Sequence, residues 1–122
     1  MIALLKEIEI RYNSPENSFS TDARLRYFDS LLAQSHTVSD SATATIYLAR
    51  TLLESGNEQK AVTLLEQFAQ QHATHQQYNR HGLMKNLALA NLRLGERTNC
   101  IGLHAAESCI FPVAGRGIHY DK

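Results

Sequence analysis

The sequence lacks several features that would point to a particular class of protein. It has no tryptophan, two prolines and two cysteines among 122 residues. Its 12 Lys and Arg balance its 12 Asp and Glu, so no excess of positive charge supports binding to nucleic-acid phosphates. No run of 18 apolar residues occurs, and Lys6 and Glu7 interrupt the apolar start of the chain. We therefore expect no nucleic-acid partner, no membrane span and no secretion signal in this chain.

The scarcity of proline leaves most of the chain available to helices. Pro15 and Pro112 lie in irregular segments, and between them apolar residues recur every three or four positions. This spacing predicts an all-α fold, with about five helices in one domain over residues 1–95. Residues 96–122 lose the spacing and read as an irregular extension that contains both cysteines. The predicted helices carry apolar stripes running from Ile2 to Tyr12, Leu25 to Leu32, Ile46 to Leu53, Ala61 to Ala69, and Leu83 to Leu92.

Glycines and short polar side chains mark the expected helix ends. Gly56 supplies a left-handed residue that ends one helix, and Asn57 can cap the next one, so the two form a hairpin. The last helix is expected to end at Leu94 and Gly95. The other expected caps are Ser20 or Asp22 for the second helix, and Ser39, Asp40 and Ser41 for the third.

The hairpin over residues 41–73 resembles a tetratricopeptide repeat. Alanines stand where the two helices approach closely, and leucines stand where they fill the gap between hairpins. The resemblance implies antiparallel hairpins stacked as a fragment of an α-solenoid, with the first two helices as a degenerate preceding pair and the fifth as half of an unfinished one. An ordinary antiparallel helical bundle is the alternative. The positions that carry the resemblance are Leu48, Ala49, Leu52, Gly56, Ala61 and Leu65.

A second resemblance concerns residues 87–119. After the last predicted helix come an Asn-Cys pair, a His, a Ser-Cys pair, a Pro and a Gly-x-His ending. This run is similar to the junction in bacterial proteins that carry tetratricopeptide helices ahead of a VCBS/FG-GAP-repeat propeller and an ASPIC/UnbV domain. The resemblance implies that the chain is the N-terminal part of a longer protein and that the protein is exported. The chain shows no signal peptide, so its compartment stays open.

The two cysteines of the extension allow three interpretations. Cys100 and Cys109 can form a local disulfide in an oxidising compartment. They can instead join His104 and His119 as a Cys2His2 set for zinc or copper, in which Cys100 and His104 would share a helical face. Finally, both cysteines can remain reduced and buried among apolar neighbours.

The predicted function is recognition of another polypeptide. Stacked hairpins offer a groove more readily than a closed catalytic pocket, and no two carboxylates form a convincing acid and base pair. We therefore expect a non-catalytic interaction or assembly scaffold without a cofactor, which binds a protein or peptide. Exposed apolar surface at the ends of the stack would also favour self-association. The alternative is a small metal-binding module that uses the Cys and His residues of the extension.

Two further sets of residues are candidate binding residues. Tyr27, Tyr47 and Tyr78 can line a peptide groove, although packing between helices is the more frequent role of such side chains. His72, His75 and His81 lack acidic neighbours at ligand spacing, so solvated surface is the preferred interpretation.

Overall fold

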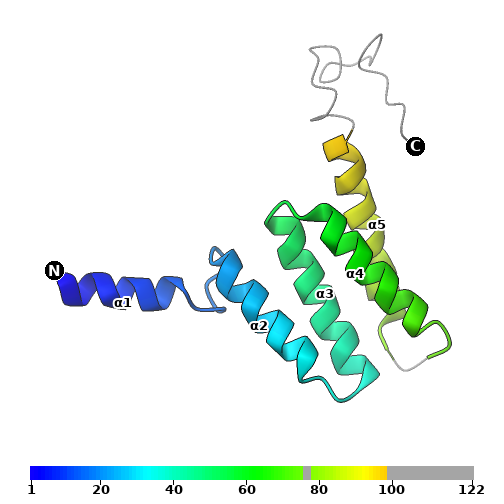
Figure 1. Cartoon of the computed structure of the whole chain (residues 1–122), viewed down its shortest axis with the longest axis horizontal. Coiled ribbons are helices and arrows are strands. Elements are labelled where there is room, and N and C mark those ends of the chain that lie inside the picture. The colour runs from blue at the N-terminus through cyan, green and yellow to red at the C-terminus, as the bar shows by residue number, and fades with distance from the viewer. Residues whose placement is uncertain (76–77, 99–122) are drawn as a thin grey trace, which may run out of the picture.

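The computed structural model describes residues 1–75 and 78–98, and every regular element in these ranges is helical. This confirms the predicted all-α fold. None of the described helices is long and apolar enough to cross a lipid bilayer. The five helices are α1 (Ile2–Tyr12), α2 (Thr21–Ala33), α3 (Val38–Glu54), α4 (Glu58–Gln71) and α5 (Arg80–Glu96), shown in Figure 1.

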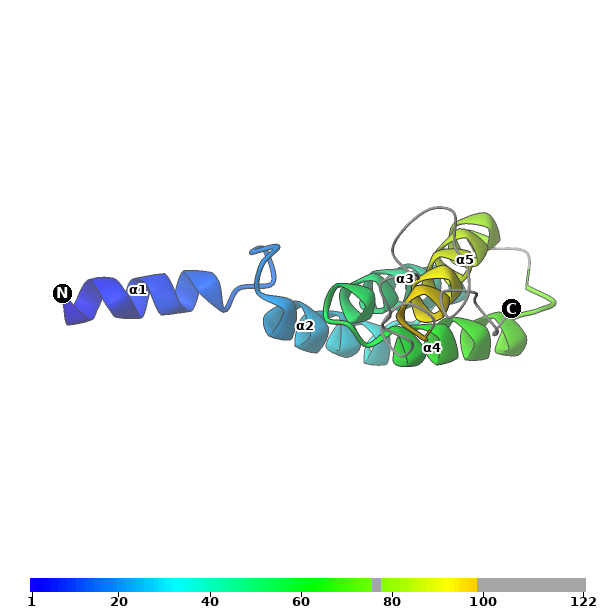
Figure 2. The ribbon, with the colours of Figure 1, turned by 90° about the horizontal axis from the view of Figure 1, so that it is seen from above.

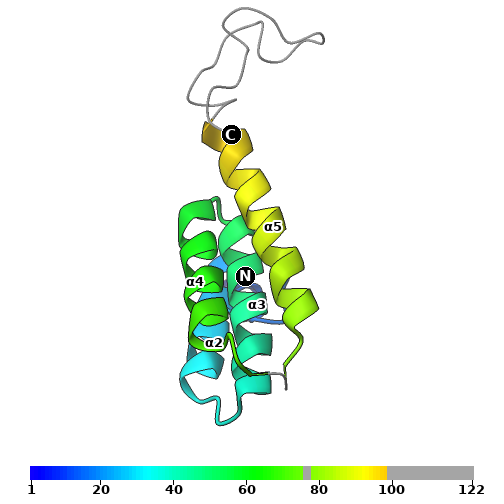
Figure 3. The same cartoon turned by 90° about the vertical axis from the view of Figure 1, so that its right-hand side faces the viewer.

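Helices α2 to α5 pack together with α3 at the centre. Helix α3 contacts α2, α4 and α5, while α4 also contacts α5. Viewed from above, α2 and α4 lie in one row and α3 and α5 in the other (Figure 2). Figure 3 shows that α5 is inclined relative to α3 and α4. The order of the chain thus alternates between two layers, as stacked helical hairpins do.

The turn between α3 and α4 forms as the glycine predicts. Gly56 has a φ of +73°, and its N–H donates to the Leu53 carbonyl at 3.2 Å. The Asn57 N–H donates to the Leu52 carbonyl at 2.8 Å, which completes a Schellman motif. Asn57 does occupy the N-cap position of α4, but its side chain donates to Ser55 Oγ at 2.8 Å instead of capping the helix. That part of the prediction is wrong.

The start of α3 also differs from the expectation. Thr37 is the cap, because its Oγ1 accepts a hydrogen bond from the Asp40 N–H at 3.1 Å. Its backbone is extended, with φ −118° and ψ 154°, as the cap position requires. The predicted caps at 39–41 lie inside the helix, which begins at Val38.

The ends of α2 and α5 add two smaller corrections. Ser20 occupies the N-cap position of α2, so Asp22 lies in the first turn, and the Ser20 side chain makes no capping bond. Helix α5 continues through Gly95 to Glu96, because Arg97 still has helical φ and ψ of −63° and −44°. A glycine inside a helix costs only about 1 kcal/mol, so this glycine does not end the helix by itself.

The core lies between α3, α4 and α5. Ala49 and Ala61 are fully buried, and the absence of larger side chains there lets α3 and α4 approach closely. Leu65 and Leu83 are fully buried too and fill the space between α4 and α5. The buried cluster consists of Ala42, Ala49, Leu53, Ala61, Val62, Leu65, Phe68, Tyr78, Leu83 and Ala90.

Helix α1 stands apart from this core. It has no buried residue, and Figure 1 shows it extending away from α2 to α5. A hydrogen-bonded turn follows it, in which Asn17 Nδ2 donates to the Tyr12 carbonyl at 3.1 Å and Asn17 Oδ1 accepts from the Phe19 N–H at 3.0 Å. The prediction that the first two helices form a packed pair is therefore wrong, because this turn directs α1 away from α2.

Candidate functional site

A hollow surface runs between α2 and α4, above α3. Two adjoining hollows of about 440 Å³ and 280 Å³ share Leu64 as a common lining residue. Helix α3 provides the floor of both, while α2 and α4 provide the walls. We call this surface the α2–α4 groove. Its lining residues are Leu25, Arg26, Asp29 and Leu32 on α2, Ser41, Thr45, Leu48 and Leu52 on α3, and Lys60, Leu64, Gln67, Phe68 and Gln71 on α4, with His72 directly after α4.

Helical spacing explains why these residues share one surface. The floor positions Ser41, Thr45, Leu48 and Leu52 follow one another at intervals of four, three and four residues. Such intervals place side chains on one face of a helix. The neighbouring face of α3 carries Ala49 and other residues of the core, so the groove and the core lie on different sides of the same helix.

One half of the groove is apolar with a charged rim. The larger hollow is lined by Leu25, Leu48, Leu52 and Leu64. The charged rim consists of Arg26, Asp29 and Lys60. Within residues 1–75 and 78–98, none of these three charged side chains takes part in an ion pair. This half can therefore bury apolar side chains of a ligand while its rim meets charges of either sign.

The other half of the groove combines Leu32, Leu64 and Phe68 with Ser, Thr, Gln and His side chains, for which we call it the polar half. Two of its buried atoms lack hydrogen-bond partners in the described ranges. Thr45 is 0% exposed, and its Oγ1 is unpaired. The second atom is His72 Nδ1, on a ring whose centroid lies 4.4 Å from that of Phe68. Buried polar atoms in native proteins are nearly always hydrogen-bonded, so these two are exceptions.

Comparison with Thr51 shows that burial alone does not leave a threonine unpaired. Thr51 lies on the same helix and is also 0% exposed. Its Oγ1 donates to the Tyr47 carbonyl at 2.9 Å, which satisfies the hydroxyl within α3. The hydroxyl of Thr45 makes no such bond.

The residues that carry the repeat resemblance are brought together in the α3–α4 hairpin. Leu48, Ala49, Ala61 and Leu65 are buried, and Gly56 forms the turn. Two of the signature leucines, Leu48 and Leu52, also line the groove.

The groove includes residues that sequence reasoning missed or misplaced. Thr45 was not singled out, because an unpaired buried hydroxyl is visible only once burial and partners are known. His72 was expected on the solvated surface, but it is half-buried against Phe68, so that expectation is wrong. His75 and His81 are exposed, as predicted.

The tyrosines do not line one surface as their earlier interpretation required. Tyr78 is 9% exposed and packs edge-on against Phe68 at 5.5 Å between ring centroids. Tyr27 and Tyr47 are half-exposed on either side of Phe28, at centroid distances of 5.2 Å and 5.3 Å. The latter three rings form a small aromatic cluster between α2 and α3.

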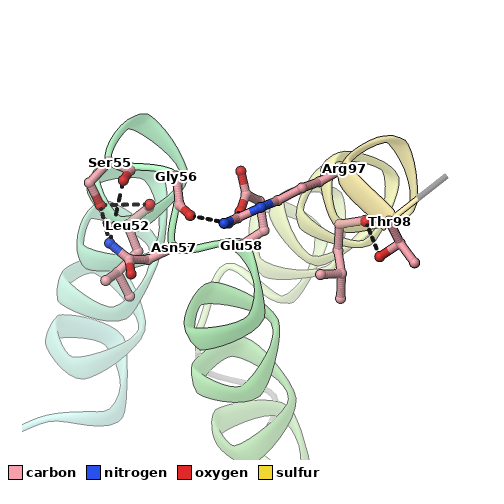
Figure 4. Close-up of polar contacts among 8 residues, drawn as sticks. Leu52, Ser55, Gly56, Asn57, Glu58, Arg97 and Thr98 are labelled. Carbon is pink, nitrogen blue, oxygen red and sulfur yellow. Dashed lines mark hydrogen bonds and ion pairs between the residues drawn. The ribbon is translucent and has the colours of Figure 1, made fainter. Parts of the chain in front are cut away.

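A polar contact fastens the end of α5 to the α3–α4 turn. The Arg97 guanidinium donates to the Glu58 carboxylate at 2.6 Å and also to the Gly56 carbonyl (Figure 4). A backbone hydrogen bond at Glu58, followed by the hydrogen bond from Arg97, lowers the pKa of this carboxyl below its ordinary value of 4.5. Because the groove lies elsewhere, this contact supports the fold and not a binding site.

The candidate metal and disulfide residues lie outside the described residues. The disulfide between Cys100 and Cys109 therefore stays a prediction, as does the zinc or copper set that adds His104 and His119. Within the ranges that the structure describes, no group of three or more His, Cys, Asp or Glu residues could hold a metal ion.

Comparisons with known proteins give no family for this chain. No family model matches it, and neither the curated proteins nor the solved structures searched contain a match. The tetratricopeptide and ASPIC/UnbV resemblances thus stay predictions from sequence.

Proposed function

We propose that this protein is a non-catalytic interaction module that binds an amphipathic helix of a polypeptide in the α2–α4 groove. The observation that carries the proposal is the division of one groove into a leucine half and a polar half. Helices bind such grooves by burying apolar residues at intervals of three and four.

The polar half gives this binding selectivity. A helix that places a hydrogen-bonding side chain over this half can bond to the exposed amides of Gln67 and Gln71. A helix with only apolar side chains there covers these amides without bonding to them, at a cost of about 1 to 3 kcal/mol for each buried group. The expected ligand is therefore an amphipathic helix whose apolar stripe ends in a hydroxyl, amide or carboxylate side chain.

Site-specific photocrosslinking tests the proposal. A benzophenone amino acid replaces Gln67, which lines the groove, or Glu66, which is exposed on α4 outside the groove. Both proteins are irradiated in extracts of the source cells, and the crosslinked peptides are sequenced by mass spectrometry. We expect the Gln67 position to label a segment with apolar residues at intervals of three and four, and the Glu66 position not to label it.

The same experiment can refute the proposal. Equal labelling of the same segments from both positions would show that the groove has no special affinity. A groove-specific adduct that Leu64→Glu does not weaken would also count against the leucine half as the binding surface, provided that circular dichroism shows the variant to be folded.

A further inference from the structure

We infer that the helix bound in the α2–α4 groove is α1 of a second copy of this chain, and that two copies exchange α1 to form a symmetric dimer. The inference rests on the proposed function, because it names the occupant of the same groove. It adds a partner and an assembly that the groove alone does not specify.

Helix α1 lacks the contacts that normally stabilise a short helix. Its 11 residues include no buried side chain and no side-chain cap at its start. Isolated helices shorter than about 12 to 15 residues are marginal in water, so a partner surface is needed. The large apolar residues of α1 are between 53% and 74% exposed, namely Ile2, Leu4, Leu5, Ile8, Ile10 and Tyr12.

The structure holds α1 away from the groove of its own chain. The hydrogen bonds of Asn17 to Tyr12 and Phe19 order the turn that follows α1. A further bond from Arg24 to the Ser18 carbonyl, at 3.1 Å, ties this turn to α2. Figures 1 and 2 both show α1 extending away from α2, α3 and α4. With this turn intact, α1 projects into the space that a second molecule can occupy.

The length of α1 matches the groove. The floor on α3 runs from Ser41 to Leu52, and a helical segment of that length spans about 16 Å. The 11 residues of α1 span about 16 Å as well. One α1 helix can therefore cover the whole floor without leaving either half empty.

The order of apolar and polar residues along α1 matches the order of the two halves of the groove. One stripe of α1 presents Ile2, Leu5 and Ile8, and ends in Tyr12. When Ile2, Leu5 and Ile8 lie over the leucine half, the Tyr12 hydroxyl at the other end of the stripe reaches the polar half. A phenol both donates and accepts hydrogen bonds, so it can bond to the exposed amides of Gln67 and Gln71 there.

The charged residues and the symmetry also fit an exchange between copies. Lys6 and Glu9 on α1 form no ion pair in the described part of the chain, and the rim likewise offers unpaired charges of both signs. Because each copy donates one α1 and accepts one, a two-fold arrangement fills both grooves. Such an assembly closes as a dimer and leaves no vacant groove for further growth.

Light scattering coupled to gel filtration tests the inference on the full chain over a concentration series. The α1 variant carries Leu5→Asp and Ile8→Asp, and the groove variant carries Leu64→Glu. A second groove variant, Gln67→Trp, fills the polar half from an exposed position and does not alter the core. Leu92→Asp is the control, since Leu92 is 59% exposed on α5 and belongs to neither surface.

We expect a wild-type dimer that Leu92→Asp preserves, whereas the α1 variant and each groove variant raise the dissociation constant at least tenfold. Mixing the α1 variant with Gln67→Trp is the decisive measurement. The first supplies an intact groove and the second an intact α1, so the mixture forms a heterodimer through one remaining contact at a concentration where each variant alone is monomeric.

Three results would overturn the inference. One is a wild-type monomer at the highest soluble concentration, as expected if residues 99–122 or a different protein fill the groove. Another is a dimer that only the α1 variant disrupts, because α1 helices would then pair with each other. A third is the absence of a heterodimer in the mixture.

If the chain is monomeric but Gln67 still crosslinks specifically to another polypeptide, the dimer fails and the proposed function stands. Loss of specificity at Gln67 would remove the function itself.

Discussion

At the scale of single residues, the unpaired hydroxyl of Thr45 is the feature that most needs an explanation. A fully buried hydroxyl without a partner lowers the stability of the free chain, because it loses hydrogen bonds to water and gains none. A methyl group in its place would avoid this cost.

Thr45→Val is predicted to raise the free energy of unfolding by about 1 kcal/mol, because it removes the unpaired hydroxyl and keeps the side-chain shape. Thr51→Val is the matched control, since Thr51 is equally buried on the same helix but donates to Tyr47. That variant is expected to lose about 1 kcal/mol. Urea unfolding monitored by circular dichroism measures both values. Equal effects of the two substitutions would contradict the assignment of Thr45 as unpaired.

At the scale of the helices, the sequence predicts the elements better than their ends. Apolar spacing predicts all five helices because each one has a coherent stripe. Gly56 is predictable too, since few other residues adopt a positive φ without a penalty. The cap of α3 is not predictable in this way, because Thr37, Ser39 and Asp40 all have suitable side chains. Only the backbone conformation decides among them.

Replacing each of the two glycines near helix ends by alanine is predicted to change the free energy of unfolding in opposite directions. Gly56→Ala is expected to lower the free energy of unfolding by about 1 to 2 kcal/mol, because alanine is strained at φ +73° although no atom lies within 4 Å. Gly95→Ala is expected to raise it by about 0.5 to 1 kcal/mol, because this glycine is helical and a Cβ meets nothing. Thermal and urea unfolding of both variants test this. A loss of stability in Gly95→Ala would mean that Gly95 ends the helix.

The contact between Arg97 and Glu58 predicts a pH dependence for the packing of α5. The folded state lowers the pKa of Glu58 below 4.5, so its contribution to stability is present above pH 4.5 and is lost as the pH falls through the folded pKa. Glu58→Gln should therefore destabilise the chain at pH 7, and this difference from wild type should shrink as the pH falls below 4.5. Urea unfolding between pH 3 and pH 7 measures it. Glu66→Gln, at an exposed position, should show no such trend.

At the scale of the whole molecule, the sequence predicts the hairpin but not the arrangement around it. The alanines at 49 and 61 indicate which faces of α3 and α4 meet, and both are fully buried. The separation of α1 could not be read in this way, because its apolar stripe looks the same whether it packs within the chain or against a second copy. The polar half of the groove was hidden for a related reason, since it combines residues from three segments.

The single core predicts that a change in α4 affects the folding of α3 and α5 as well. Leu65→Ala is expected to cost about 2 to 5 kcal/mol, because Leu65 is fully buried in the cluster that joins these helices. Leu92→Ala, at a 59% exposed position on α5, should change the stability by less than about 0.5 kcal/mol. Denaturant unfolding followed by circular dichroism tests the contrast. A similar loss in both variants would contradict the placement of the core.

The position of α3 links the groove to the rest of the molecule. One side of this helix forms the floor of the α2–α4 groove, and another side packs against α5. A ligand that tilts or shifts α3 must therefore also shift the surface of α3 on which α5 packs. Arg97, directly after α5, donates a hydrogen bond to the Gly56 carbonyl in the α3–α4 turn. Binding of a ligand in the groove would therefore also displace the C-terminal end of α5, where the chain continues toward residue 99.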